Sequence, residues 1–157
     1  MKLKMSLLML VLACAGCQSS GRFNAAQIAA MQQAGFTQNA EGWGLGLSDK
    51  ILFGVNEADL TPSSKVSIST MARNLAATGI THLRIDGHTD NYGKPDYNQQ
   101  LSLKRADAVA RQWADGAAIP RANIVTRGLG MREPVASNST AQGRAQNRRV
   151  AIVITAP

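Results

Sequence analysis

Apolar residues follow two different spacings along the chain, and these spacings predict its main helices and strands. Residues 61–78 are expected to form a helix, because Thr61 and Pro62 suit a helix start and an apolar stripe follows at i, i+3, i+4 and i+7, namely Ile68, Met71, Ala72 and Leu75. Residues 83–88 alternate between apolar and polar side chains, which is the period of a strand. A second helix is predicted over about residues 97–114, where the apolar side chains gather on one side.

Three further segments complete the predicted fold. Residues 45–53 and 123–129 are expected to be strands, and the nearly continuous apolar run 150–154 is typical of a buried strand. Residues 132–142 are predicted to form a loop, and residues 143–149 lead from it into the last strand. The order β-α-β-α-β-β predicts a two-layer α/β sandwich over residues 45–157.

A short helical linker is expected before this domain. Asn24 can cap a helix with Gln27 at its third position, and Phe23 can pack onto Ile28. Gly35 is expected to end this helix.

Two aromatic residues follow the linker helix in a polar, glycine-containing stretch. Phe36 and Trp43 have two interpretations: they anchor the segment to the domain, or they form an exposed site for a protein partner.

The N-terminus has the features of an export signal. Lys2 and Lys4 precede an apolar run over residues 5–13, which is too short to span a bilayer as a helix. Ala15 and Gly16 before Cys17 resemble the lipobox of bacterial lipoproteins. That resemblance implies a signal peptide over residues 1–16, acylation of Cys17 and a lipidated linker over residues 17–44, with Cys14 as the competing site.

Charge and cysteine content narrow the function classes. The formal charge is +7, and removal of Lys2 and Lys4 with the signal leaves 7 − 2 = +5, which suits anionic partners in an envelope. Nucleic acid is not expected as a partner of an exported chain without a clustered basic stripe. Both cysteines lie in the signal region, so the domain is expected to have neither a disulfide nor a reactive thiol.

The candidate chemistry lies in residues 86–106, at the end of one predicted strand and the start of the next helix. Asp90 and Arg105 flank a polar loop that contains Gly93. Asn98 lies seven residues before Arg105 and therefore on the same side of the helix. In one interpretation, Asp90 binds an ammonium group, Arg105 binds a carboxylate and the amides of residues 91–93 bind the remaining oxygens.

Two other interpretations of this stretch are open on spacing alone. Asp86, His88 and Asp90 are two residues apart on a strand with one solvated face, so they could face one way and hold a metal ion in a hydrolytic site. Asp90 and Arg105 could instead form an internal salt bridge that fixes the loop to the helix.

Two multi-part motifs resemble those of OmpA-like peptidoglycan-binding domains. One runs from Asp86-Gly-His-Thr-Asp90 through Tyr97-Asn98 to Arg105-Ala106, and the other from Gly128-Leu-Gly130 to Val150. The resemblance implies a non-enzymatic domain without a cofactor, which binds the diaminopimelate of peptidoglycan peptides non-covalently. It implies binding residues at Asn56, Asp90, Gly93, Asn98 and Arg105, and it leaves the role of Arg148 open.

The resemblance extends to outer-membrane lipoproteins of a signalling system. Such a lipoprotein captures a periplasmic repressor and thereby releases an inner-membrane diguanylate cyclase, which makes cyclic-di-GMP. This implies an outer-membrane protein whose domain faces the periplasm and whose Phe36 and Trp43 either contact the repressor or pack back on the domain. Gln18 agrees, because aspartate after the acylated cysteine marks inner-membrane retention in enterobacterial lipoproteins. A purely structural tether is the alternative, and a homodimer is left open.

Overall fold

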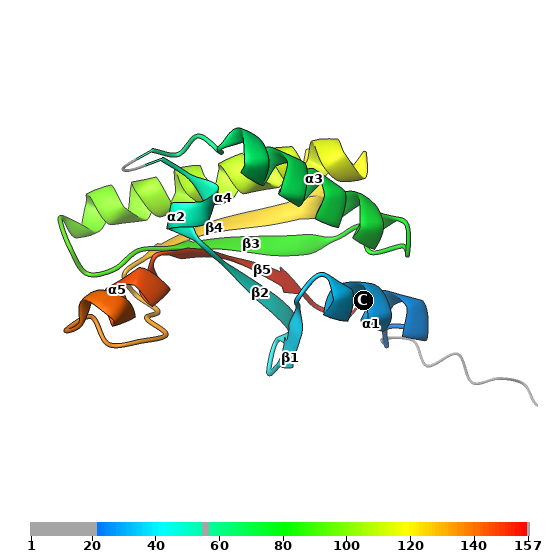
Figure 1. The fold of residues 1–157 in the computed structure, drawn as a ribbon, viewed down its shortest axis with the longest axis horizontal. Coiled ribbons are helices and arrows are strands. Elements are labelled where there is room, and N and C mark those ends of the chain that lie inside the picture. Colours follow the sequence, from blue (N-terminus) through cyan, green and yellow to red (C-terminus); the bar gives the residue numbers. More distant parts are fainter. Residues whose placement is uncertain (1–21, 55–56, 157) are drawn as a thin grey trace, which may run out of the picture.

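The computed structural model describes residues 22–54 and 57–156. In these ranges a five-stranded sheet carries two long helices, α3 (Pro62–Ala76) and α4 (Pro95–Ala117), on one face (Figure 1). The strands lie in the order β1-β2-β5-β3-β4, where β3 and β4 are parallel and the other neighbours antiparallel. Their bounds are β1 Thr37–Asn39, β2 Gly42–Ser48, β3 Leu83–His88, β4 Ile124–Gly130 and β5 Arg149–Ile154. The predicted two-layer α/β fold class is confirmed.

The two long helices begin and end for local reasons. Thr61 caps α3, because its hydroxyl accepts a hydrogen bond from the Ser64 amide at 3.3 Å, and Pro62 occupies the first turn. Pro95 starts α4, and Ala118 ends it with a left-handed φ of 54°. Both helices bury an apolar side against the sheet, and the largest fully buried side chains include Trp113, Ile68, Leu75, Ile85 and Ile152. None of the helices in the described ranges is both long and apolar enough to span a bilayer.

Three shorter helices and a 3₁₀ turn complete the fold. Helix α1 (Ala25–Gln33) packs beside α3, and helix α5 (Ala141–Asn147) lies toward the opposite end of the molecule (Figure 1). The helical turn α2 (Asp49–Leu52) follows β2, and the 3₁₀ turn Arg121–Asn123 precedes β4. Helix α5 falls in a region that was predicted to be loop and approach to the last strand. Its cap is Thr140, whose hydroxyl accepts from the Gly143 amide at 3.0 Å, and a glycine inside the helix obscured it in the sequence.

The predicted strand 45–53 is wrong in its second half. Strand β2 ends at Ser48, and Asp49 begins the turn α2. The Asp49 amide still donates a hydrogen bond to the Arg148 carbonyl at 3.1 Å. Leu52 and Phe53 are adjacent and both are buried. A continuous strand would point these neighbours to opposite faces, whereas the helical turn lets both reach the core.

The predicted linker helix is present as α1, and it docks on the domain. The capping box forms as expected, with the Gln27 amide donating to Asn24 at 2.8 Å and the Asn24 amide donating to Gln27 at 3.0 Å. Met31 is fully buried in the core, which accounts for the docking of a weakly apolar helix.

Phe36 and Trp43 anchor the β1–β2 hairpin to the core. They are only 3% and 8% exposed, so neither presents the surface that a partner site requires. Contact with a repressor through these side chains would need the hairpin to leave the domain, and it stays a prediction. The hairpin also means that the sheet begins at Thr37, before residue 45, where the domain was expected to start.

Candidate functional site

A cavity of about 580 Å³ lies at the carboxyl end of β3, between α2 and the start of α4. Its position follows from the close packing of β3 on α4, where Gly87 lies against the backbone of Ser102. The lining residues come from four separate segments and are Asp49, Lys50, Phe53, Gly54, Thr89, Asp90, Tyr92, Gly93, Tyr97, Asn98, Leu101, Arg105 and Arg148. The sequence-predicted residues Asp90, Gly93, Asn98 and Arg105 are therefore brought together in one cavity.

Four charged side chains form a continuous chain of ion pairs in this cavity. Arg148 Nη1 donates to Asp90 Oδ2 at 2.7 Å, and Arg148 Nε lies 3.5 Å from Asp49 Oδ2. The same Asp49 oxygen accepts from Arg105 Nη1 at 3.3 Å. The alternative interpretation, a direct salt bridge between Asp90 and Arg105, is wrong, because each pairs with a residue from a distant segment.

Arg105 is fixed on three sides. Its Nε donates to the Glu57 carbonyl at 2.9 Å, and its guanidinium carbon lies 5.1 Å from the centre of the Phe53 ring. With the Asp49 contact, these interactions hold a buried guanidinium in one orientation. A fixed guanidinium fork suits a planar carboxylate, since little side-chain entropy remains to be lost on binding.

The loop after β3 is held by its own side chains. Asp90 Oδ1 accepts from the Tyr92 amide at 2.9 Å, and Asn98 Nδ2 donates to the Tyr92 carbonyl at 2.7 Å. Gly93 has a φ of 86°, a conformation that L side chains rarely adopt. The Tyr92 amide is therefore already used within the protein, and the expectation that it binds ligand oxygens is wrong. Asn98 fixes the loop and shares the buried helix side with Arg105, as its spacing predicted.

The strand residues Asp86 and His88 belong to a different cluster from the cavity. Asp86 accepts hydrogen bonds from Arg84 and from Arg127, at 2.7–3.0 Å. Burial alone would raise the pKa of Asp86, but hydrogen bonds and charge from Arg127 and Arg84 outweigh it and hold this pKa below its usual value. The face was predicted to be solvated, and that is wrong, because the arginines cover it and Asp86 and His88 are only 3% and 5% exposed.

Among the described residues, Asp86, His88 and Asp90 do not form the metal site that their spacing suggested. Burial, together with the positive charge of the neighbouring Arg149, lowers the pKa of His88 to about 4. Asp86 is occupied by Arg84 and Arg127, and Asp90 by Arg148. Within residues 22–54 and 57–156, no group of histidine, cysteine and acidic side chains is placed to hold a metal ion.

Sequence reasoning missed part of the site. Asp49 and Phe53 were assigned to a strand, and the role of Arg148 was left open, yet all three contact Asp90 or Arg105. The order of residues gives no sign of these contacts, because they join residues 52 to 58 positions apart. Two predicted residues, Asn56 in the binding site and Cys17 at the lipid anchor, lie outside the described ranges.

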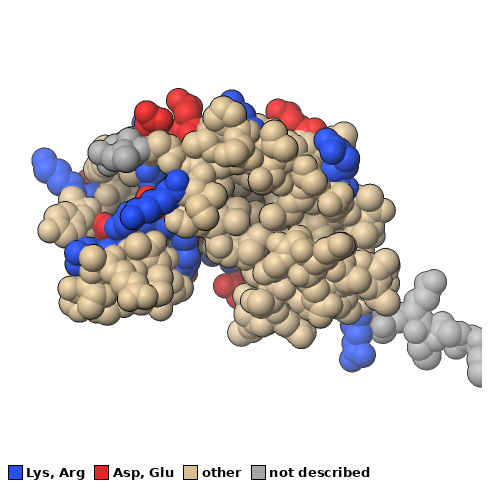
Figure 2. Space-filling model, viewed as in Figure 1, with Lys and Arg blue, Asp and Glu red and all other residues tan. Residues whose placement is uncertain are grey.

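Charge is distributed unevenly over the molecule. Figure 2 shows basic side chains gathered at the end that carries α2 and α5, with acidic atoms between them, whereas the region around α1 is mostly uncharged. This is the end where the cavity lies. Anionic polymers would therefore be attracted toward the cavity.

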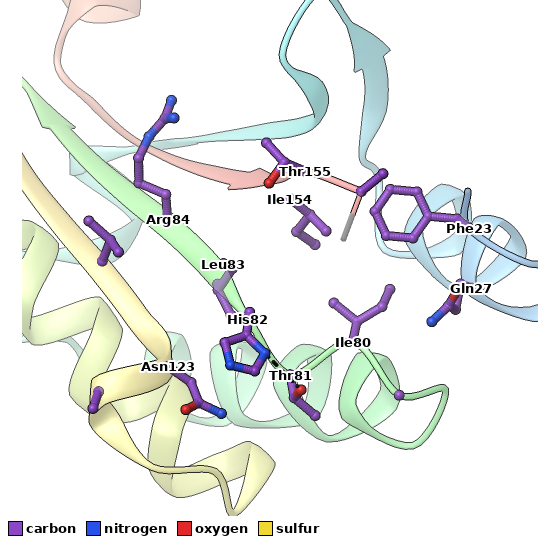
Figure 3. Close-up of a pocket in the computed structure, with 14 residues that line it drawn as sticks. Phe23, Gln27, Ile80, Thr81, His82, Leu83, Arg84, Asn123, Ile154 and Thr155 are labelled. Carbon is purple, nitrogen blue, oxygen red and sulfur yellow. Dashed lines mark hydrogen bonds between the residues drawn. The ribbon is translucent and has the colours of Figure 1, made fainter. Parts of the chain in front are cut away.

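A second cavity of about 500 Å³ lies at the opposite end of β3 (Figure 3). Phe23 from the segment before α1 faces Ile80 and Ile154 across it, and His82 contacts Thr81 at 3.1 Å. Its lining is mainly apolar and contains no ion pair between its residues. It lacks the paired charges that would orient a zwitterion.

Comparison with known proteins places this site in a family. The model of the OmpA family matches residues 52–148, which is more than half of the chain. This range includes three of the four charged residues of the ion-pair chain, namely Asp90, Arg105 and Arg148. The chain belongs to the OmpA family.

Two relatives of this OmpA-family chain are similar over nearly their whole length. Lipoprotein YfiB of Escherichia coli is 61% identical over 143 residues, which cover 90% of this chain and 89% of that protein. The outer-membrane lipoprotein YfiB of Pseudomonas aeruginosa is 48% identical over 157 residues, or 98% of this chain and 93% of that protein. These names describe lipoproteins rather than enzymes, in agreement with the expected non-enzymatic domain.

Solved structures of other proteins share the OmpA-family fold. The cell wall anchor of the type VI secretion system from Pseudomonas aeruginosa superposes with a TM-score of 0.68 at 23% identity, covering 88% of this chain and 99% of that one. The peptidoglycan-associated lipoprotein from Burkholderia pseudomallei gives a TM-score of 0.57 at 29% identity, covering 66% of this chain and 86% of that one.

Proposed function

We propose that this chain is an outer-membrane lipoprotein that binds peptidoglycan non-covalently through the cavity at the end of β3. The observation that carries the proposal is the cavity itself, where two fixed guanidinium groups and two carboxylates face the same space. Membership of the OmpA family supports it, as does a relative that is named an outer-membrane lipoprotein. Another relative, 39% identical over 104 residues, is named peptidoglycan-binding protein ArfA.

The ligand that fits this cavity is the free end of diaminopimelate, which carries an ammonium and a carboxylate on one carbon. Asp90 would accept from the ammonium, and the fixed fork of Arg105 would bind the carboxylate in a bidentate manner. Asn98 and Gly93 hold the loop that closes the cavity. Asn56 is proposed as a further contact from the resemblance to the family. Binding breaks no covalent bond, so no catalytic residue is required.

The first test is co-sedimentation with purified peptidoglycan. Asp90→Asn should weaken binding about ten- to a hundredfold, because it removes the charge that pairs with the ligand ammonium. Asp96→Asn is the matched control, since Asp96 is an exposed acid in the first turn of α4, and it should bind like the wild type. If Asp90→Asn sediments as strongly as Asp96→Asn, this cavity is not the binding site.

The N-terminus completes the proposed localisation. We propose that residues 1–16 are removed as a signal peptide, that Cys17 is acylated and that residues 17–44 join the lipid to the domain, which faces the periplasm. The lipoprotein relatives support this arrangement. The mass of the mature N-terminal peptide distinguishes Cys17 from Cys14 and would contradict the proposal if it carried no lipid.

We further propose a signalling function like the one that the sequence resemblance implies, in which the chain captures a periplasmic repressor and so relieves inhibition of a diguanylate cyclase. Similarity to two proteins named YfiB over 90% and 98% of this chain supports it. The purified domain should form a complex with the repressor in size-exclusion chromatography, and Asp90→Asn should leave that complex intact. Absence of a complex would favour the purely structural tether.

A further inference from the structure

Asp49 is the one member of the ion-pair chain that contacts both guanidinium groups. Its Oδ2 lies 3.3 Å from Arg105 Nη1 and 3.5 Å from Arg148 Nε, and its side chain is 13% exposed. Two guanidinium groups this close to one oxygen would repel each other without the carboxylate between them. Asp49 therefore keeps both cations in the cavity at fixed positions.

The second oxygen of Asp49 has an unusual environment. Oδ1 is buried and has no hydrogen-bond partner among the described residues. Leaving a buried acceptor without a donor is costly, so most buried polar atoms in proteins are paired. Because Oδ1 is inaccessible as the side chain stands, a ligand donor would reach it only after the Asp49 carboxylate turns toward the cavity that Asp49 lines. An ammonium group brings three such donors.

The balance of charge in the cavity leads to the same ligand. Asp49 and Asp90 oppose Arg105 and Arg148, so the four inner groups sum to zero, and Lys50 stands exposed at the rim. An ammonium that binds Asp90 must compete with Arg148, which already donates to that carboxylate at 2.7 Å. A second carboxylate beside the cavity helps the ammonium to compete. Without Asp49, two cations would face one anion, and the cavity would favour a simple carboxylate.

We propose that Asp49 is a specificity-determining residue, which makes the cavity select a ligand end that carries an ammonium as well as a carboxylate. It does so by adding a second negative charge beside the ammonium that binds Asp90 and by holding the two guanidinium groups with Oδ2. The inference rests on the proposed peptidoglycan binding and adds to it the reason why a carboxylate alone is not enough.

Three stem peptides that differ only at the third residue test the inference by calorimetric titration. One carries diaminopimelate, one carries 2-aminopimelate, which lacks the distal ammonium, and one carries lysine, which lacks the distal carboxylate. The wild type should bind the diaminopimelate peptide at least about tenfold more tightly than either of the others. Asp49→Asn should reduce the preference over 2-aminopimelate about tenfold and should leave the preference over lysine nearly unchanged.

The controls separate selectivity from folding. Asp107→Asn removes a carboxylate that does not line the cavity and that pairs with Arg121 at a distance of 2.9 Å. This variant should not alter either preference. Asp49→Glu keeps the charge and should retain most of the preference over 2-aminopimelate. Asp49→Ser serves as a second charge-removing variant if the asparagine variant folds poorly, and the ratio of two dissociation constants does not depend on the folded fraction.

The outcomes distinguish this inference from the function on which it rests. If the wild type binds the diaminopimelate peptide no better than the lysine peptide, the proposed function itself is wrong. If the wild type prefers diaminopimelate but Asp49→Asn weakens all three peptides by the same factor, Asp49 has only a structural role and the inference is overturned. Loss of the preference over 2-aminopimelate in Asp49→Glu would overturn it as well.

Discussion

Replacing Gly87 by alanine is expected to destabilise the domain by at least about 3 kcal/mol, since overpacking against backbone costs more than the usual range. A Cβ atom on Gly87 would lie 1.9 Å from the carbonyl oxygen of Ser102 and 2.6 Å from its carbonyl carbon. Ser102 lies inside α4, so the clash is with helix backbone and no side-chain rotation can relieve it. Strand β3 and helix α4 would have to separate.

This separation should also impair binding, because β3 leads to Asp90 and α4 carries Arg105. The expected result is a lower denaturant midpoint for Gly87→Ala, together with weaker sedimentation with peptidoglycan under conditions where the variant is still folded. Gly46→Ala is the matched control, since the nearest atom to a Cβ there is Arg149 Cδ at 3.8 Å, an ordinary contact. A midpoint for Gly87→Ala that equals the control would show that β3 and α4 tolerate a wider spacing.

The elements that sequence patterns predicted well are those with a long and simple periodicity. Helices α3 and α4 each bury one face, and the spacing of their apolar residues records that face. The alternation along β3 predicted the strand correctly, although both of its faces are largely buried. The turn α2 and helix α5 have few residues and little periodicity, so local sequence does not distinguish them from strand or loop. Burial of Phe36 and Trp43 depends on a hairpin that pairs β2 with β5, more than 100 residues later.

The site was predictable only where its residues are close in the sequence. Asp90 and Gly93 lie in the loop after β3, and Asn98 and Arg105 lie on the helix that follows, so spacing and the family motif both indicate them. The side chains that neutralise them lie elsewhere, with Arg148 reaching Asp90 across 58 positions and Asp49 reaching Arg105 across 56. Asp90 and Arg105 could have paired with each other on spacing alone. In the folded chain Asp90 instead pairs with Arg148, and Arg105 pairs with Asp49.

Replacing Arg105 by methionine is expected to have the second large effect, on stability as well as binding. Breaking a buried ion pair by removing one partner usually costs about 3–5 kcal/mol, because the remaining charge is left without compensation. Here Asp49 would still have Arg148 at 3.5 Å, so a loss near 3 kcal/mol, at the lower end of that range, is expected. The Glu57 carbonyl would also lose the donor that now lies 2.9 Å away.

A double variant identifies the cause of that loss. The cost of Arg105→Met could come from the Asp49 carboxylate that loses its partner. In that case, adding Asp49→Ser should recover part of the stability, because it removes the uncompensated charge. Arg111→Met, at an exposed position on the same helix, controls for the substitution itself and should change stability by less than about 1 kcal/mol. Denaturant unfolding of the four proteins completes a mutant cycle. Additive losses in the double variant would mean that Arg105 stabilises the domain through its packing on Phe53 rather than through its charge, and that the ion-pair chain contributes little to the fold.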